Sequence, residues 1–146
     1  MRQIVFISAI LLFVGGLAIY MLSSRSDLTQ DLLFPLSCDL NLNSCTVEKD
    51  GERVKFSISP LPIKPLKEFE LKISGLKECK EYVVKARGLN MHMGVVQAPL
   101  EQIAKDECRA KMIVASCTEP VMRYRVELFK GKESSEIYAD FDLVQR

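Results

Sequence analysis

The chain is poor in the residue types on which most catalytic sites depend. Its 146 residues include one histidine, no tryptophan and seven glycines. A nucleophilic relay that uses histidine would have to use His92, and no nucleophile with a nearby base is evident in the sequence. The formal net charge of +1 provides no field that would attract nucleic acid. We therefore expect neither an enzyme nor a nucleic-acid-binding protein.

Several short motifs are also missing. The sequence has no glycine-rich phosphate-binding loop, no Cys-x-x-Cys pair and no internal repeat. The first absence argues against nucleotide binding, and the second argues against a zinc ribbon or a thioredoxin-like thiol oxidoreductase.

One long apolar run stands at the N-terminus. Residues 4–22 contain no charged side chain, and Arg2 precedes them. A helix of this length spans about 29 Å, which is enough for the hydrocarbon core of a bilayer. A cleavable signal is the alternative, but its apolar region is usually shorter and ends in a small-x-small site. We expect a signal anchor over residues 1–23 and a linker over 24–34, with the rest of the chain outside the cytoplasm.

The remaining sequence alternates between apolar and polar residues in short runs, as β-strands do. The expected strands cover residues 53–59, 68–74, 81–86, 110–116, 123–129 and 137–143. Turns are expected at 48–52, which contains Asp-Gly, and at 130–136. The proline-rich residues 60–65 are expected to connect two sheets, and residues 98–105 to form a short helix. The pattern predicts an all-β fold, an immunoglobulin-like antiparallel β-sandwich, over residues 35–146.

Five cysteines make an odd count, and outside the cytoplasm disulfides persist. Cys38 and Cys45 are close enough in sequence to close a small loop. Cys79 and Cys108 flank the two central strands and form a second candidate pair. Sequence alone does not determine connectivity, so other pairings stay open. The suggested pairing leaves Cys117 outside both disulfides.

Sulfur donors gather around the single histidine. Met91, His92 and Met93 are consecutive, and Cys117 is followed five residues later by Met122. Thioether and thiolate donors suit copper(I), whereas hard cations need oxygen ligands and zinc needs more cysteine or histidine. In a strand Met91 and Met93 would share one face and His92 the other, but a loop would remove that constraint. Methionine also fills irregular gaps in cores, so a purely structural role is the competing interpretation.

Four segments carry a resemblance to a protein family. They are PLSCDLNLNSC (35–45), SISPLPIKPLKEFELKISGL (57–76), GLNMHMG (88–94) and CTEPVMRYRVELF (117–129). Together with the N-terminal run, they resemble small membrane-anchored bacterial periplasmic proteins associated with copper handling and cytochrome oxidase assembly. A more distant likeness is to anchored β-sandwiches of the FixH and YtkA type. The family's Asn-Met-x-Met-Gly and Cys-x4-Met elements match Met91, Met93, Cys117 and Met122, whereas Cys79 and Cys108 lie outside the shared pattern.

The resemblance implies a single-pass inner-membrane protein whose C-terminal domain lies in the periplasm. Its cofactor would be copper, and its partner a membrane-bound oxidase or a copper chaperone. The alternative is a metal-free anchored interaction or scaffold domain, in which Met91 and Met93 form an adaptable apolar contact.

Overall fold

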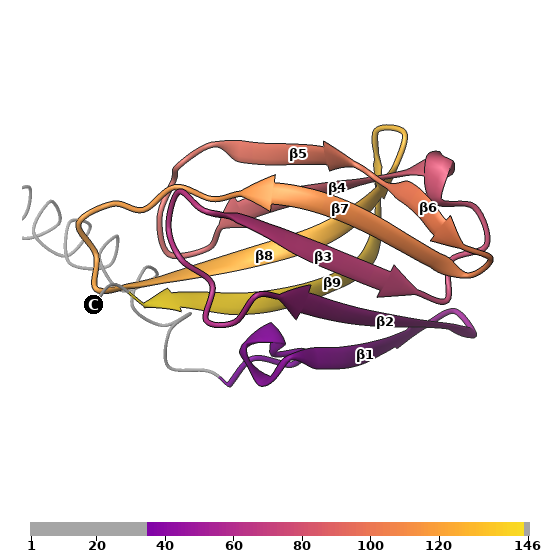
Figure 1. Cartoon of the computed structure of the whole chain (residues 1–146), viewed down its shortest axis with the longest axis horizontal. Helices are drawn as coiled ribbons and strands as arrows, with labels where there is room; N and C mark the ends of the chain where they lie inside the picture. Colours follow the sequence, from indigo (N-terminus) through magenta and orange to yellow (C-terminus); the bar gives the residue numbers. More distant parts are fainter. Residues whose placement is uncertain (1–34, 145–146) are drawn as a thin grey trace, which may run out of the picture. The chain divides into compact units, whose positions relative to one another are not determined.

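The chain folds into two antiparallel sheets that face one another, as the computed structural model shows (Figure 1). The structure describes residues 35–144. The first sheet has the order β1-β2-β3-β7-β6 and the second the order β5-β4-β8-β9. The strands are β1 (Ser44–Lys49), β2 (Glu52–Ser59), β3 (Glu68–Ser74), β4 (Tyr82–Gly88), β5 (Val95–Pro99), β6 (Glu101–Ala104), β7 (Glu107–Ile113), β8 (Val121–Lys130) and β9 (Glu133–Val144). Two short 3-10 helices, η1 (Leu40–Leu42) and η2 (Cys79–Glu81), precede β1 and β4.

The core lies between the sheets and follows from the two-residue period of the strands. In β3, Phe69, Leu71 and Ile73 are buried while Lys72 between them is exposed. Phe69 meets Phe141 of the opposite sheet edge to face, with ring centroids 5.8 Å apart. Pro35–Arg146 form one compact unit that contains the whole described core. A unit with a core of its own is expected to fold independently.

All six expected strands are present, with ends that differ by a few residues, and both expected turns join neighbouring strands. Asp50 and Gly51 have φ of 51° and 82° in the β1–β2 hairpin, as the favoured two-residue hairpin turn requires. Gly131 has φ of 63° in the β8–β9 hairpin.

The prediction of a helix over residues 98–105 is wrong. This segment ends β5 and forms β6, the edge strands of the two sheets. Its alanines, glutamate and glutamine favour a helix locally, but Ala98 and Leu100 are buried where the chain crosses between sheets. Pro99 is tolerated because an edge strand can do without one ladder donor. Tertiary packing here overrides local propensity.

The expected role of residues 60–65 also needs correction. They do not connect two sheets, because β2 and β3 are neighbours in the same sheet. Proline does exclude the segment from the ladder, as expected. The chain instead leaves the sheet, forms a loop at its end and returns beside the strand it left.

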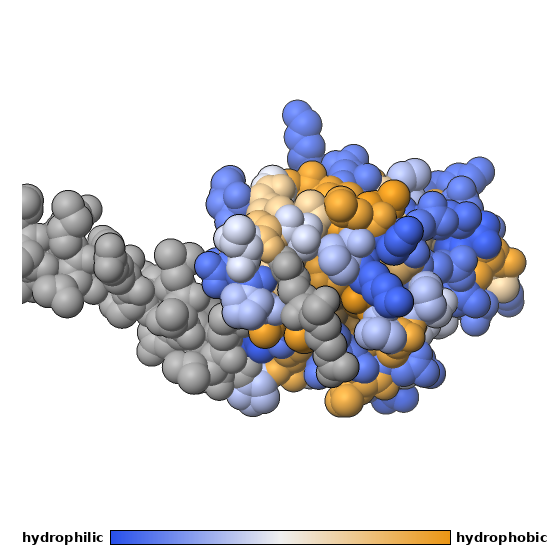
Figure 2. Space-filling model, turned by 60° about the vertical axis from the view of Figure 1, so that its left-hand side comes forward, coloured by the Kyte–Doolittle hydropathy of each residue, from blue (hydrophilic) through white to orange (hydrophobic). Residues whose placement is uncertain are grey.

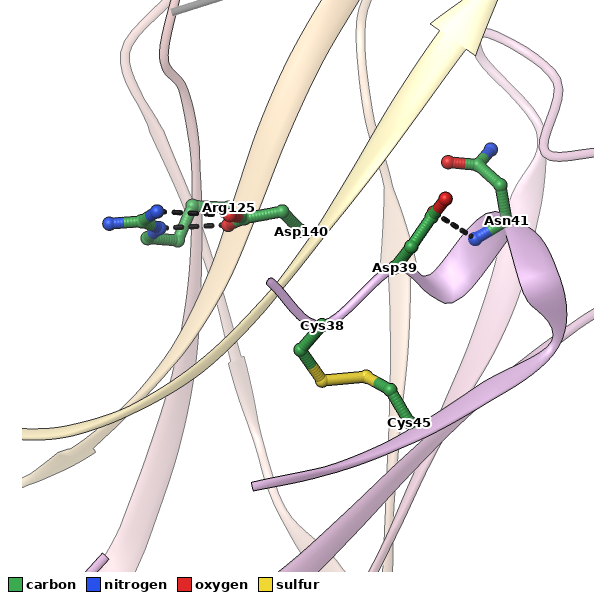
Figure 3. Close-up of a disulfide and its surroundings, with 6 residues drawn as sticks. All are labelled: Cys38, Asp39, Asn41, Cys45, Arg125 and Asp140. Carbon is green, nitrogen blue, oxygen red and sulfur yellow. Dashed lines mark hydrogen bonds and ion pairs between the residues drawn. A yellow bond between two sulfur atoms is a disulfide. The ribbon is translucent and has the colours of Figure 1, made fainter. Parts of the chain in front are cut away.

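Two disulfides join the expected cysteine pairs. Cys38–Cys45 ties the segment before η1 to β1, and its Cα atoms are 5.3 Å apart. Figure 3 shows this bridge beside Asp39, which accepts a hydrogen bond from the Asn41 backbone N–H at 2.8 Å. Cys79–Cys108 joins η2 to β7, with Cα atoms 5.6 Å apart. Because η2 directly precedes β4, this bridge connects the start of the second sheet to the first sheet.

The predicted anchor over residues 1–23 and the linker over 24–34 lie outside the described residues. Within residues 35–144, no helix is long and apolar enough to cross a bilayer.

The two disulfides should contribute unequally to stability. Because the Cys79–Cys108 bridge spans 29 residues of sequence and the Cys38–Cys45 bridge only 7, the longer loop loses more unfolded-state entropy. Replacing Cys79 and Cys108 with alanine should lower the free energy of unfolding by about 3–4 kcal/mol, against about 2–3 kcal/mol for Cys38 and Cys45. Urea unfolding of residues 35–146 would measure both. Equal losses, or a larger loss for the short loop, would contradict this account.

Candidate functional site

The sulfur-bearing residues lie at one end of the sandwich. Met91 and Met93 are in the β4–β5 connection, Cys117 is in the β7–β8 connection, and Met122 is the second residue of β8. Both connections emerge at the end where β8 begins (Figure 1). Two stretches of chain that are far apart in sequence, one with Met91 and Met93 and the other with Cys117 and Met122, therefore bring sulfur to one place. We call these four side chains the sulfur cluster.

The alternation of β8 directs its two site residues inward. Met122 and Tyr124 are only 1% and 3% exposed. Arg123, between them, lies on the outer face and forms a two-pronged pair with Asp142 of β9, at 2.8 and 3.0 Å. The salt bridge outside and the apolar packing inside both require the same register of β8 against β9.

Cys117 is the centre of the sulfur cluster. Its Sγ lies 2.8 Å from Sδ of Met91, and its backbone N–H donates to Sδ of Met122 at 3.2 Å. Met91, Met93 and Cys117 are half-buried and pack against the core. One buried residue, Met122, and three half-buried residues thus make up the cluster.

Tyr124 contacts the sulfur cluster from the core side. Its hydroxyl donates to the carbonyl of Ala115 at 2.7 Å, two residues before Cys117. Sδ of Met93 is 3.9 Å from the same oxygen, which is a packing contact because the single hydroxyl proton is already committed to Ala115. Burial, and secondarily the charge of a Cys117 thiolate, raise the pKa of Tyr124. The residue therefore stays neutral and keeps its hydroxyl as a donor.

Asn90 holds the β4–β5 connection, residues 89–94, against β8. We call this connection the methionine loop. The side-chain amide of Asn90 donates to the carbonyl of Val121 at 2.9 Å and accepts from the N–H of Arg123 at 2.9 Å. These two residues flank Met122, so Asn90 holds Met91, the next residue in its own chain, beside Met122. The backbone N–H of Leu89 adds a bond to the carbonyl of Arg123 at 2.8 Å.

Gly88 permits the tight return of this loop. A Cβ atom at this position would lie 2.5 Å from the carbonyl oxygen of Met91, closer than real Cβ atoms come to backbone. Any larger residue at position 88 would force the backbone around Met91 to shift. Gly88, Asn90 and Tyr124 complete the site without being predicted as site residues, although the first two belong to the segment GLNMHMG (88–94).

His92 differs from its neighbours. Its side chain is exposed, whereas those of Met91 and Met93 on either side are half-buried. This is the alternation expected of a strand-like segment, with the two methionines on one face. The contribution of His92 to a metal site stays a prediction.

The donor set restricts the kinds of metal that could bind. Within the described residues, no group of three or more histidine, cysteine, aspartate or glutamate side chains could hold a metal ion. A metal at the sulfur cluster would therefore depend on methionine. Thioether sulfur is a soft, uncharged donor, which suits copper(I) and not calcium, magnesium or zinc.

Comparison with family models, curated proteins and solved structures finds no match for this chain.

The two hydrogen bonds of the Asn90 side chain should contribute measurably to the free energy of unfolding. Replacing Asn90 with alanine leaves a carbonyl and an N–H of β8 without their partner, and should lower the free energy of unfolding by about 1–3 kcal/mol. Asn41 offers a matched control, because its amide makes the same kind of paired contact with the backbone of Asp142, at 2.8 and 2.7 Å. Since Asn41 is exposed, Asn41→Ala should cost less. An Asn90→Ala protein as stable as wild type in urea would contradict the assigned role.

Proposed function

We propose that this chain is a membrane-anchored copper(I)-binding module that holds the ion at the sulfur cluster. The observation that carries the proposal is the meeting of Met91, Cys117 and Met122, joined by contacts of 2.8 and 3.2 Å. Met93 packs against Tyr124 at the edge of the same group. Filling a gap in the core does not by itself account for the contact between the Met91 thioether and the Cys117 thiol.

Copper(I) fits the donors, and small movements would admit it. With metal–sulfur bonds of ~2.3 Å, two sulfur ligands of one ion lie about 4 Å apart. Met91 and Cys117 would therefore separate by about 1 Å on binding. Met91 can make this change because its side chain has three rotatable bonds and belongs to a loop. Met122 is fixed by the strand and would serve as the rigid end of the site.

The exposure of the donors suits transfer more than permanent storage. A partner can reach the half-buried Met91, Met93 and Cys117, whereas Met122 is buried. An incoming ligand could displace the outer donors one at a time. We infer from the family resemblance that the recipient or donor is a membrane-bound oxidase or a copper chaperone.

The finer fold assignment in this proposal is an immunoglobulin-like sandwich. The orders β2-β3-β7-β6 and β5-β4-β8-β9 match an immunoglobulin A-B-E-D sheet and a C-C′ pair beside F and G, with β1 as an added edge strand. Tyr124 supports the match, because its hydroxyl bonds back to Ala115 across the connection before β8, as a tyrosine corner does. In this scheme the sulfur cluster occupies the E–F corner and the adjacent C–C′ loop.

The anchor and compartment belong to the proposal as well. They are supported by the uncharged run of residues 4–22 and by the arginine before it. The two disulfides fit a compartment outside the cytoplasm, where such bonds persist. A tether of this kind would keep the domain near a membrane-bound recipient.

Copper titration tests the site. Residues 35–146, with both disulfides intact, should bind one copper(I) per chain in competition with a coloured copper(I) chelator. Changing Met91, Met93 and Met122 together to leucine should abolish this binding, because leucine keeps the volume but removes the sulfur. Met112→Leu is the matched control, since Met112 is a buried methionine of β7 and should leave binding unchanged. Unaltered stoichiometry in the triple variant would rule out this site.

The Asn90 contacts should also affect the metal. Asn90→Ala should weaken copper(I) binding by about 10–100-fold, the usual effect of losing a residue that orients ligands. Asn41→Ala should leave it unchanged, because Asn41 contacts β9 rather than the cluster. Equal affinities for the two variants would show that Asn90 has no part in the site.

A metal-free interaction domain is the second candidate, favoured by large apolar side chains that are exposed at the same end of the sandwich. The two functions respond differently to a copper(I) chelator. A partner complex captured from membranes should fall apart on chelation if copper bridges or shapes the interface. A complex that survives chelation and also survives the triple methionine variant would favour the metal-free function.

A further inference from the structure

Exposed large apolar residues are concentrated at the end of the sandwich that carries the sulfur cluster. Seven such residues are found within residues 35–144: Leu42, Leu61, Leu66, Val95, Ile103, Ile113 and Val144. All except Ile103 lie at this end, and Leu42 does so because the neighbouring Asn41 is hydrogen-bonded to the backbone of Asp142, near the end of β9. Figure 2, in which this end comes forward, shows apolar side chains gathered among hydrophilic ones. We call these six residues the apolar end.

The topology explains why these residues share one end of the sandwich. Val95 begins β5, whereas Ile113 and Val144 end β7 and β9, and these strand ends share one side of the sandwich (Figure 1). Leu61 and Leu66 belong to the β2–β3 connection there. The backbone N–H of Leu66 donates to the carbonyl of Val114 at 2.9 Å, which joins this connection to the segment leading to Cys117. The apolar end and the sulfur cluster therefore lie at the same end of the sandwich and are linked through the β7–β8 connection.

Leu66 is the most unusual of the six. It is 70% exposed and has a φ of 57°, a conformation that bulky residues seldom adopt. Neither packing within the domain nor backbone preference explains a leucine here. Asparagine or glycine would suit the backbone better and would cost less in exposed apolar surface.

The same connection carries positive charge. Lys64 and Lys67 are exposed beside Leu61 and Leu66. Lys64 and Lys67, together with Pro62, Pro65 and Val144, help to line a groove of about 690 Å³. The acidic Asp142 at this groove is already paired with Arg123, and Glu119 is the exposed acidic side chain of the β7–β8 connection. Apolar tips flanked by lysine suit a surface with hydrocarbon beneath anionic head groups.

We propose that the apolar end docks on the surface of an anionic bilayer. The chain outside the described structure supports this choice of occupant. Twelve residues, 23–34, separate the apolar run of residues 4–22 from Pro35, and twelve residues reach at most about 40 Å. This part of the argument rests on the anchor in the proposed function. A tether of that length keeps even weak docking populated, and docking would turn the sulfur cluster toward membrane-embedded partners.

Vesicle binding by the isolated domain tests docking without the anchor and without copper. Residues 35–146 should co-sediment with vesicles of phosphatidylethanolamine and phosphatidylglycerol, and more weakly with vesicles of phosphatidylcholine alone. The double variant Leu66→Asn, Val95→Thr should bind at least about tenfold more weakly, because two apolar contacts are lost. Asparagine accepts the backbone of position 66 and threonine suits a strand, so the fold should be kept. Ile103→Thr, at the other end, is the matched control and should bind like wild type.

A second variant separates charge from apolar contact. The double variant Lys64→Glu, Lys67→Glu should bind the anionic vesicles much more weakly than wild type. Any binding that remains should no longer weaken as salt is added. Failure of the wild-type domain to bind either kind of vesicle, or equal binding by the apolar double variant and Ile103→Thr, would overturn the proposal. The proposal would also be overturned if the solution molecular mass of the isolated domain rose with protein concentration in the absence of vesicles. The apolar end would then be the contact with a second copy of the chain. Copper(I) affinity should be unchanged in the apolar double variant, so docking and metal binding can fail separately.

Discussion

The arrangement of the sulfur cluster depends on the pairing of β4 with β8. The ladder runs from Tyr82 opposite Lys130 to Gly88 opposite Tyr124. Beyond its last pair, the backbone of Leu89 and the side chain of Asn90 continue to bond to β8. The methionine loop is thus an extension of a central strand pair, held on one side by one backbone hydrogen bond and by the side chain of Asn90. A site built in this way has one rigid wall and one adaptable wall.

β8 carries structure on one face and candidate function on the other. On the outer face Arg123 and Arg125 pair with Asp142 and Asp140, each through two hydrogen bonds. The bond to Asp140 raises the pKa of Arg125. Buried ion pairs often contribute little net stability, because desolvation offsets their attraction. Their effect here is best understood as fixing register, since a slip of one residue would turn Met122 outward.

Across the sandwich, the core fixes the same register. The ring of Tyr124 stacks on Phe141 with centroids 5.5 Å apart, and Phe141 meets Phe69 of the first sheet. The hydroxyl of Tyr124 then reaches Ala115 in the β7–β8 connection. One side chain therefore couples core packing to the loop that carries Cys117. The position of the thiol depends on the core as much as on its own loop.

Metal binding and surface docking make compatible demands on this end of the domain. A transfer site must expose some donors, and the residues that surround it are then exposed as well. Val95 and Ile113 border the two connections that hold Met93 and Cys117. A surface that covered these residues would also shield the sulfur atoms from water and from oxidants. Contact with a partner or a membrane would in this way both orient and protect the site.

The sequence alone determined those features that depend on local chemistry. Period-two runs such as residues 68–74 identify strands because side chains alternate across a sheet, and Asp50–Gly51 identifies a hairpin because few residues accept positive φ. The short spacing of Cys38 and Cys45 made their pairing a natural expectation. The methionine motif stood out because soft donors are rare at such density. Each of these signals comes from residues within a few positions of one another.

Only the tertiary structure decided which distant groups meet. Residues 98–105 have helical composition yet form edge strands, because burial of Ala98 and Leu100 at the crossover outweighs propensity. Asn90 bonds to residues more than thirty positions away, and nothing in its local sequence indicates this. The contact between Met91 and Cys117 likewise depends on the strand order, which brings the β4–β5 and β7–β8 connections to one end. Strand order is a property of the whole core, and so local pattern alone could not determine it.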